Sequence, residues 1–200
     1  MELCHPASQH PTEVSRKSLV ATFITLRLLT TEMRTSCFQL VRPDDTYVPA
    51  VITVESGIVP EEYLATLNEA ERALLWREWL TRDIRTYIAD LDGKIVGFIS
   101  GGAIREPVLT YDAEFYAIYL LQSTQRQGIG TALLKELAGS LLSGGFKSMI
   151  VWVLEKNPWK DFYAKSSAQV VTTKDIQIGG ITLSEVSYGW PDLEAITSPK

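Results

Sequence analysis

The chain has 200 residues, of which 46% are hydrophobic and 22% are charged, as is ordinary for a protein with one hydrophobic core. Its formal net charge of −5 argues against a general nucleic-acid binder, because such proteins carry a basic excess. The two cysteines, Cys4 and Cys37, have no metal-ligand spacing, so we expect no disulfide scaffold and a reducing, cytoplasmic setting.

The positions of the histidines and of the apolar runs exclude further classes. Both histidines, His5 and His10, lie in the first ten residues, which disfavours Ser-His and Cys-His nucleophiles and histidine zinc sites unless the amino terminus folds into the site. We therefore expect no metal, and acid–base chemistry from carboxylates, tyrosines or lysines. No run reaches the ~20 apolar residues of a membrane span. The apolar stretch 19–29 is interrupted by Arg27 and is followed by no small-residue cleavage pattern, so we expect no signal peptide.

The first part of the chain predicts an extension followed by helices. Residues 1–36 show no strand alternation, and we interpret them as a poorly anchored amino-terminal extension; a short amphipathic helix over 18–30 is the alternative. A strand is predicted over 38–42, then a helix over 46–56 that the preceding acidic pair can cap. A proline and two glutamates then begin a helical segment over 60–80.

The rest of the chain alternates strands and helices between clear turn signals. Asp92-Gly93 predicts one hairpin and Gly179-Gly180 another, while Ser100-Gly101-Gly102 is typical of a bulge or a strand end. The predicted strands cover 85–89, 94–99, 113–121, 149–154, 170–178 and 181–188, and the predicted helices cover 128–142 and 158–165. This order predicts an α/β fold: a mixed, mostly antiparallel sheet flanked by helices, in which one strand–helix–strand unit supplies a parallel pair.

The loop between the strand 113–121 and the next helix reads Gln125-Arg126-Gln127-Gly128-Ile129-Gly130. A glycine-bearing loop at a helix start leaves backbone N–H groups unpaired, and the helix dipole favours negative charge there. Gly128 and Gly130 let the backbone approach a ligand with no side chain in between. The loop therefore predicts that the chain holds a phosphate-bearing molecule.

A Rossmann dinucleotide site is one interpretation of this loop. Gly128, Gly130 and the acidic Glu155 after the next strand favour it. However, six residues separate the strand from Gly128, too many for the tight Rossmann turn, and Leu133 stands where the third small residue belongs. The unit also has no doubly wound partner, so this interpretation is disfavoured.

The second interpretation is a resemblance to a family. Ala113-Glu114, the strand to Leu120 and the glycine loop together resemble the acetyl-CoA-binding motif of the GNAT superfamily of N-acetyltransferases. The stretch Trp152–Asn157 and the pair Phe162-Tyr163 resemble the motif that follows, and the closing hairpin 178–191 resembles that of small bacterial members. The resemblance covers about residues 37–193, which it implies form a single-domain GNAT fold, with 194–200 as a carboxyl-terminal tail.

The resemblance implies an acetyl-CoA-dependent N-acetyltransferase that acts by direct attack of a primary amine, and it gives roles to individual residues. Tyr163 would protonate the departing thiolate, and Glu114 stands where some members carry the general base. Asn157 would touch the pantetheine arm or position the next helix. The other implied cofactor contacts are the strand end and the backbone amides of the loop, namely Ile118, Tyr119, Leu120, Gln125, Arg126, Gln127, Gly128, Ile129, Gly130 and Thr131.

Each of these roles has a simpler alternative. Glu114 at a strand start can be a solvated edge charge, Tyr163 can be a core tyrosine, and Asn157 can cap the next helix. The chain also departs from the family pattern at two positions. Gln122 replaces a proline, and Ser167 replaces a glycine, which puts a side chain where a left-handed turn is expected.

The sequence gives the least information about the acceptor substrate. Glu55, Glu61 and Glu62 give the helical segment an acidic character, which favours a cationic amine. We therefore expect a small-molecule amine as the acceptor. A protein or peptide amine and a non-catalytic acyl-CoA-binding module are the alternatives, and a homodimer is left open.

Overall fold

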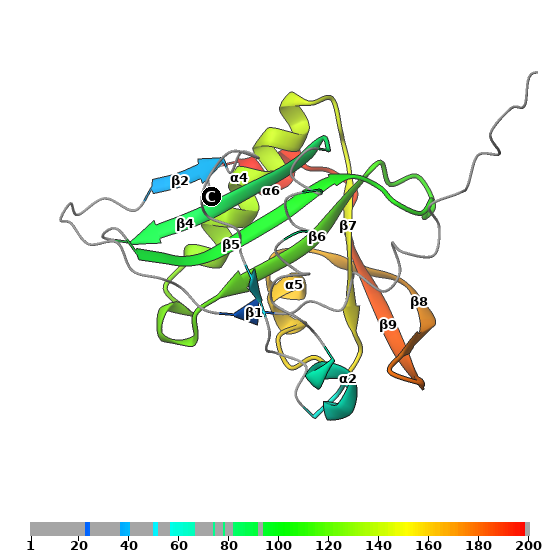
Figure 1. Cartoon of the computed structure of the whole chain (residues 1–200). Helices are drawn as coiled ribbons and strands as arrows, with labels where there is room; N and C mark the ends of the chain where they lie inside the picture. The colour runs from blue at the N-terminus through cyan, green and yellow to red at the C-terminus, as the bar shows by residue number, and fades with distance from the viewer. Residues whose placement is uncertain are drawn as a thin grey trace, which may run out of the picture.

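Apolar residues that alternate along the strands build an open, seven-stranded sheet in the order β2-β4-β5-β6-β7-β9-β8 (Figure 1). The computed structural model describes residues 23–24, 37–40, 50–51, 57–66, 74, 78, 82–91 and 94–198. The strands of the sheet are β2 (Cys37–Leu40), β4 (Ile84–Leu91), β5 (Lys94–Ala103), β6 (Ala113–Leu120), β7 (Met149–Leu154), β8 (Gln169–Ile178) and β9 (Ile181–Trp190).

The sheet is antiparallel except between β6 and β7, which pair in parallel. Helix α4 (Ile129–Ser143) connects these two strands, which confirms the predicted strand–helix–strand unit. The register of β5 with β6 shifts between Ser100 and Gly101, so the bulge predicted there is confirmed.

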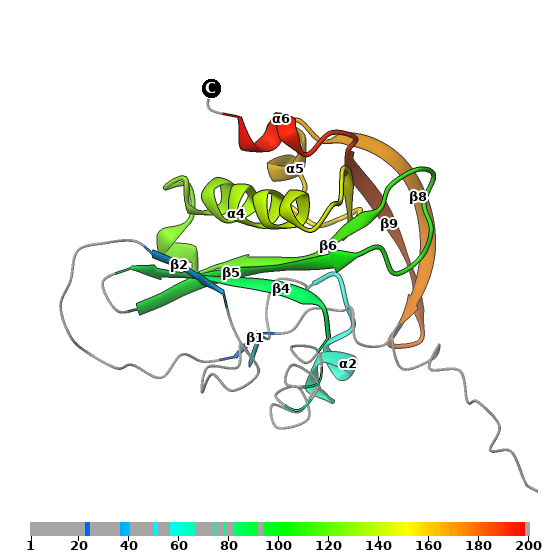
Figure 2. The same ribbon diagram turned by 90° about the horizontal axis from the view of Figure 1, so that it is seen from above.

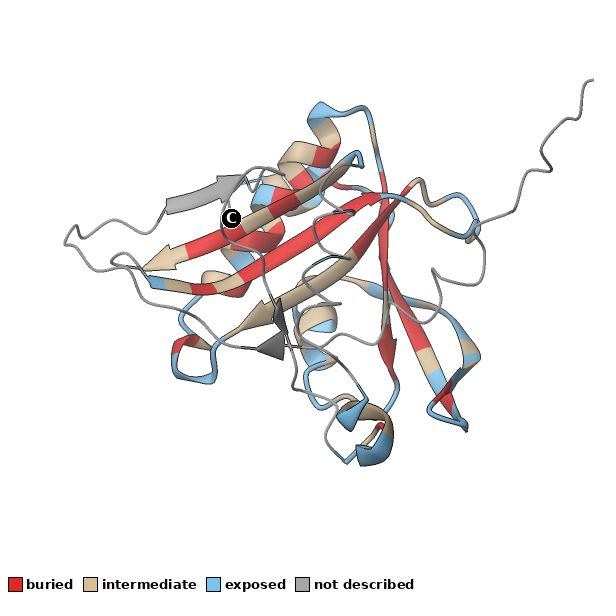
Figure 3. Ribbon diagram, viewed as in Figure 1, coloured by how far each residue is buried: buried red, intermediate tan, exposed pale blue. Residues whose placement is uncertain are grey.

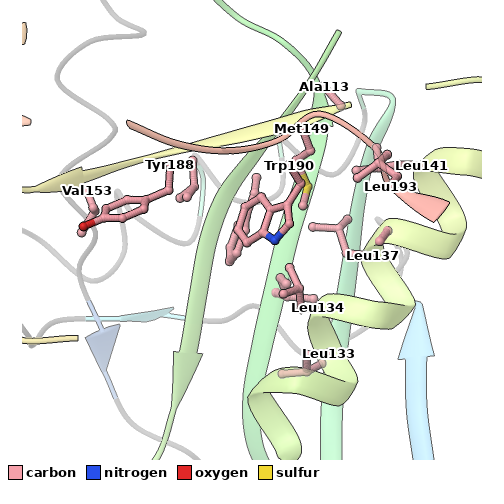
Figure 4. Packing of buried hydrophobic residues seen from close by; sticks show 14 of the residues in the cluster. Ala113, Leu133, Leu134, Leu137, Leu141, Met149, Val153, Tyr188, Trp190 and Leu193 are labelled. Atoms are coloured by element: carbon pink, nitrogen blue, oxygen red, sulfur yellow. The ribbon is translucent and has the colours of Figure 1, made fainter. Parts of the chain in front are cut away.

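Helix α4 packs on the sheet through one apolar face, because its large apolar residues recur at intervals of three and four. Leu133, Leu134, Leu137 and Leu141 are fully buried there. Trp190 of β9 fills the space between helix and sheet (Figure 4), and its indole N–H donates a hydrogen bond of 2.7 Å to the carbonyl of Ser166. Figure 3 shows the buried residues concentrated along α4 and the central strands.

The two faces of the sheet are covered by different elements. Helices α4, α5 (Asp161–Lys165) and α6 (Glu194–Thr197) lie on one side, and α2 (Glu61–Ala65) lies on the other (Figure 2). We call these the α4 face and the α2 face. The register pairs Val151↔Tyr188 and Val153↔Val186 belong to the core on the α4 face, so the alternate pairs of β7 and β9 point to the α2 face. There Leu154 packs with Val59, Ile178 and Leu183, beside residues of α2.

The structure corrects some expectations about the helices. The helix predicted over 46–56 is wrong at Ala50–Val51, which form β3 and pair antiparallel with β1 (Phe23–Ile24). That pairing also contradicts the alternative of a helix over 18–30, and the rest of 1–36 lies outside the described residues. Helix α5 is shorter than the predicted 158–165, and residues 194–197 of the predicted tail form α6, which contacts α4. No helix among the described residues is long and apolar enough to cross a membrane.

Candidate active site

Strands β6 and β7 pair only at their first residues and then diverge. The register contains Ala113↔Met149, Glu114↔Ile150 and Phe115↔Val151, and no described residue of β7 pairs with β6 beyond Phe115. Figure 1 shows the two strands running in different directions from that point. The predicted cofactor contacts Ile118, Tyr119 and Leu120 all lie on the diverging part of β6, where the strand edge toward β7 is not used for sheet pairing.

The glycine loop leads from β6 into α4 and exposes the amino end of that helix. A short 3₁₀ helix, η1 (Gln122–Thr124), starts the loop at the position of the missing proline. Gly128 precedes α4 with a φ of +83°, a left-handed conformation that glycine adopts without strain. No side chain in the described part of the chain caps this helix, so the first-turn N–H groups of Ile129, Gly130 and Thr131 point out of the helix end without an intrahelical acceptor.

The polar side chains of the loop hold its shape rather than block its amides. The side-chain amide of Gln125 donates to the carbonyl of Leu120 at 3.3 Å, and that of Gln127 donates to the carbonyl of Ser123 at 3.0 Å. Arg126 between them has a φ of +61°, an uncommon conformation for a residue with a Cβ. Two left-handed residues in three, Arg126 and Gly128, turn the backbone so that successive N–H groups can converge on an anion.

The two glycines of the loop have different roles. A Cβ on Gly128 would meet no atom within 4 Å, so this position is required for its backbone conformation. A Cβ on Gly130 would lie 3.2 Å from Leu120 Cδ1 and 3.3 Å from Phe162 Cε2, so this position is required for packing. The prediction that both glycines clear space for a ligand therefore needs correction at Gly130, whose open side is occupied by the ring of Phe162.

Tyr163 follows Phe162 on α5 and lies in a cluster of aromatic rings. The centroid of its ring lies 6.0 Å from that of Phe115, 5.5 Å from that of Tyr188 and 6.4 Å from that of Trp190. Its hydroxyl has no hydrogen-bond partner among the described residues. It does not belong to the polar side-chain atoms that are both fully buried and without a partner. Desolvation by burial raises the pKa of Tyr163, so the hydroxyl stays protonated at neutral pH and can donate.

Asn157 lies in the turn between β7 and α5. Its side-chain oxygen accepts a hydrogen bond of 2.8 Å from the backbone N–H of Trp159, and its own N–H donates to the carbonyl of Leu154 at 2.8 Å. These contacts support the alternative in which Asn157 positions the segment before α5. No described residue accepts a hydrogen bond from its side-chain NH₂ group.

Glu114 is buried at the start of β6, with 2% of its surface exposed, and it pairs with Arg105 from the loop that follows β5. Glu114 Oε2 accepts from the backbone N–H of Arg105 at 3.2 Å and from its Nε at 2.9 Å, while Oε1 accepts from Nη2. The Arg105 guanidinium also lies over the ring of Tyr116, 4.6 Å from its centroid. A carboxylate whose two oxygens are both held by a guanidinium is poorly placed to remove a proton, so these contacts weigh against the predicted role of Glu114 as general base.

A second carboxylate on the α2 face was missed from the sequence. Glu185 of β9 lies near Lys174 of β8, with 3.9 Å between Oε2 and Nζ, and Lys174 lies over the ring of Trp152 at 4.1 Å from its centroid. Glu185 lies in a strand whose polar and apolar residues alternate in the ordinary way, so no local sequence pattern marks it. Only the register of β9 with β7 places it at the site. No group of metal-binding side chains occurs among the residues that the structure describes.

Comparison with known proteins agrees with this geometry. The family model described as "Acetyltransferase (GNAT) family" matches residues 54–166. The uncharacterized N-acetyltransferase YuaI of Bacillus subtilis (strain 168) is 45% identical over 146 residues, which is 72% of this chain and 83% of that protein. Among solved structures, an N-acetyltransferase from Staphylococcus aureus Mu50 has a TM-score of 0.56 at 18% identity and covers 80% of this chain and 99% of its own. The yncA protein from Salmonella typhimurium, solved with its cofactor acetyl-CoA, has a TM-score of 0.56 at 15% identity over 83% and 98% of the two chains.

Proposed function

The chain belongs to the GNAT acetyltransferase family, and we propose that it transfers the acetyl group of acetyl-CoA to the primary amine of a small molecule by direct attack. The observation that carries this proposal is the uncapped amino end of α4, with the left-handed Gly128 before it, next to the diverging edge of β6 and the ring of Tyr163. This arrangement combines an anion site, an extended backbone edge and a proton donor.

The residues of the loop fit the pyrophosphate of a coenzyme A thioester. The first-turn amides of α4 have no intrahelical acceptor, and the helix is fifteen residues long, so its dipole adds to them. The empty space around Gly128 leaves room for a bulky anion close to the backbone. We assign the amides of Arg126 to Thr131 to this contact, and the diverging backbone from Ile118 to Leu120 to the pantetheine arm. The predicted contact of the Gln125 amide needs correction, because this N–H donates to the carbonyl of Gln122 at 3.3 Å.

Tyr163 is the proton donor of the proposed reaction. Acetyl-CoA supplies a thioester whose thiolate leaves when an amine attacks. The pKa of Tyr163 is raised by burial, so the hydroxyl is neutral over the working pH range and can stabilise the departing sulfur by donating a hydrogen bond. No described residue is hydrogen-bonded to this hydroxyl, which supports the role, because a hydroxyl already engaged in a structural bond could not turn to a ligand.

The acceptor belongs on the α2 face. Of the described helices, α4, α5 and α6 cover the other side of the sheet (Figure 2), and the buried Glu114, beside the place where β6 and β7 diverge, belongs to the α2 face. Glu61 and Glu62 are exposed in the first turn of α2. Acidic side chains attract a cationic amine, which favours an ammonium-bearing metabolite over a neutral acceptor.

A matched panel of acceptors tests this proposal. Release of the CoA thiol is measured with small primary amines and with short peptides of similar charge, and kcat/KM is compared between the two sets. We expect the highest kcat/KM for a small amine and stabilisation of the protein by acetyl-CoA but not by NAD. A clear preference for peptides would indicate a protein or peptide amine as the acceptor. Stabilisation by NAD alone would contradict the whole proposal.

A further inference from the structure

Two carboxylates of the α2 face lie near the divergence of β6 and β7, and their surroundings differ. Glu114 accepts three hydrogen bonds from Arg105, and its side chain is 3% exposed. Glu185 accepts no hydrogen bond from any described residue, and its side chain is 16% exposed. The only cation in contact with it there is Lys174, at 3.9 Å. Glu185 therefore has open acceptor positions and access to solvent, whereas both oxygens of Glu114 are engaged by Arg105 and its side chain is almost fully buried.

The strand register places Glu185 beside the diverging end of β7. Across β7 its partner is Leu154, and across β8 its partner is Lys174. Trp152 lies two residues before Leu154, on the same face, and its ring is the surface on which the Lys174 ammonium rests. Trp152, Lys174 and Glu185 thus form one patch on the α2 face, at the part of β7 that no longer pairs with β6.

We propose that Glu185 is the catalytic base that takes the proton from the acceptor ammonium. The inference rests on the proposed function, which brings the thioester to the diverging edge of β6 and the amine to the α2 face. Lys174 is a positioning residue: its ammonium donates to Glu106 Oε2 at 3.3 Å and attracts the Glu185 carboxylate, whose Oε2 lies 3.9 Å away. The Glu114–Arg105 pair fixes the loop that borders the patch.

The electrostatic surroundings of Glu185 favour a carboxylate that is more basic than a solvated one. Burial raises the pKa of Glu185, Lys174 and Arg105 oppose this shift, and Glu114 and Glu106 add to it. These groups belong to β8, to the loop after β5 and to β6, the elements whose charges act on Glu185. A carboxylate with a raised pKa is a stronger base than a solvated one.

The proton and electron balance of the step is simple. The Glu185 carboxylate accepts one proton from R–NH₃⁺, and the neutral amine attacks the thioester carbon, forming the N–C bond. The C–S bond then breaks, and the thiolate takes a proton from the Tyr163 hydroxyl. The phenolate regains a proton from the nitrogen, which becomes the amide N–H, and Glu185 releases its proton to water.

The test uses Glu185→Gln in the full-length protein, with acetyl-CoA and the best amine of the panel. We expect kcat/KM at pH 7 to fall by ~10²–10⁴-fold, with a smaller loss at high pH, where free amine with its pKa of ~10.4 no longer needs a base. Acetyl-CoA affinity should stay unchanged, because the patch lies away from the glycine loop. Glu185→Asp, which keeps a carboxylate, should recover part of the rate.

A second variant separates catalysis from a structural role. Lys174 lowers the pKa of Glu185, so Lys174→Met should move the acidic limb of kcat/KM to higher pH, whereas a purely structural ion pair would leave the limb in place. The control is Asp175→Asn, because Asp175 neighbours Lys174 in β8, points to the other face and accepts from Ser184 Oγ at 2.7 Å. We expect this control to match the wild type.

The possible outcomes separate the role of Glu185 as the base from the proposed acetyltransferase function. A wild-type protein that turns over amines while Glu185→Gln keeps the same kcat/KM and pH profile would overturn the inference alone. A Glu185→Gln protein that binds acetyl-CoA normally but loses rate equally at all pH values would assign Glu185 to positioning, also against the inference. No amine-dependent turnover by the wild type on any acceptor would overturn the proposed function and the inference with it.

Discussion

The ring of Phe162 lies against Gly130, so closely that a methyl group on this glycine would come within 3.3 Å of Phe162 Cε2. Gly130 is in the first turn of α4, and Phe162 precedes Tyr163 on α5. The contact therefore links the loop that we assign to the pyrophosphate with the helix that carries the proposed proton donor. Cofactor position and proton-donor position depend on the same pair of residues.

Gly130→Ala should disturb this link. Alanine in a helix is usually better than glycine by up to ~1 kcal/mol, but here the added methyl group overpacks the contact, which costs roughly 1–3 kcal/mol. We expect a lower Tm and a larger loss in kcat than in acetyl-CoA affinity. The matched control is Gly139→Ala on the same helix, where the new methyl group would meet nothing closer than Thr197 Cγ2 at 3.9 Å. A Gly130→Ala protein as stable and active as this control would contradict the packing role.

Gly128→Asp should weaken acetyl-CoA binding through charge. Aspartate and asparagine both tolerate the left-handed conformation at this position, and neither would meet an atom within 4 Å of its Cβ. Gly128→Asn is therefore a control of nearly equal shape without the charge. We expect calorimetry to show at least ~tenfold weaker acetyl-CoA binding for Asp than for Asn, equivalent to ~1.4 kcal/mol. Equal affinity in the two variants would remove the loop from the cofactor site.

Tyr163→Phe should lower kcat and leave the fold and acetyl-CoA affinity intact. The change removes only a hydroxyl that has no partner in the described structure, and it keeps the ring among Phe115, Tyr188 and Trp190. A proton donor contributes typically ~10²–10⁴-fold. Since burial raises the pKa of Tyr163 above its usual 10.0, the wild type should show no loss of rate from ionisation of this group below about pH 10. A chemistry-limited rate unaltered by the substitution would exclude Tyr163 as the donor.

Glu114→Gln should act on stability before it acts on chemistry. The substitution leaves the half-buried Arg105 guanidinium without its counter-charge, and the loss should be smaller than the roughly 3–5 kcal/mol that breaking a fully buried pair costs. We expect a clear drop in Tm and an acidic limb of kcat/KM close to that of the wild type. Replacing Arg105 by Met in the same protein should recover part of the loss, because no uncompensated charge remains. A normal Tm with a limb displaced to higher pH would instead restore Glu114 as the base.

Local sequence patterns predicted most of the sheet and the crossover helix. Asp92-Gly93 and Gly179-Gly180 separate strands that the structure pairs as β4–β5 and β8–β9. The left-handed turn expected at Ser167 is also confirmed, with a φ of +66°. These features depend on residues close in sequence, where turn chemistry and alternation carry the information.

The features that the sequence did not predict depend on contacts between distant segments. The predicted helix over 46–56 contains Ala50–Val51, which pair instead with Phe23–Ile24, and no pattern within either segment shows that pairing. Arg105 and Glu114 are joined across a loop, and Glu185 reaches the site only through the register of β7 with β9. In the sequence, such a carboxylate is only one more polar residue of an alternating strand. The fold determines which of its oxygens accept hydrogen bonds from neighbouring residues.

Acetylation of an amine by acetyl-CoA on this protein is tested most directly by following thiol release and acetylated product together. The measurement combines wild-type protein, acetyl-CoA and the amine panel at pH 7 to 9, with Tyr163→Phe run in parallel. We expect one CoA released per acetylated amine, a rate that depends on the amine, and a loss of ~10²-fold or more in the variant. Binding of acetyl-CoA without amine-dependent release on any small amine, peptide or protein would contradict this expectation and leave a non-catalytic acyl-CoA-binding module.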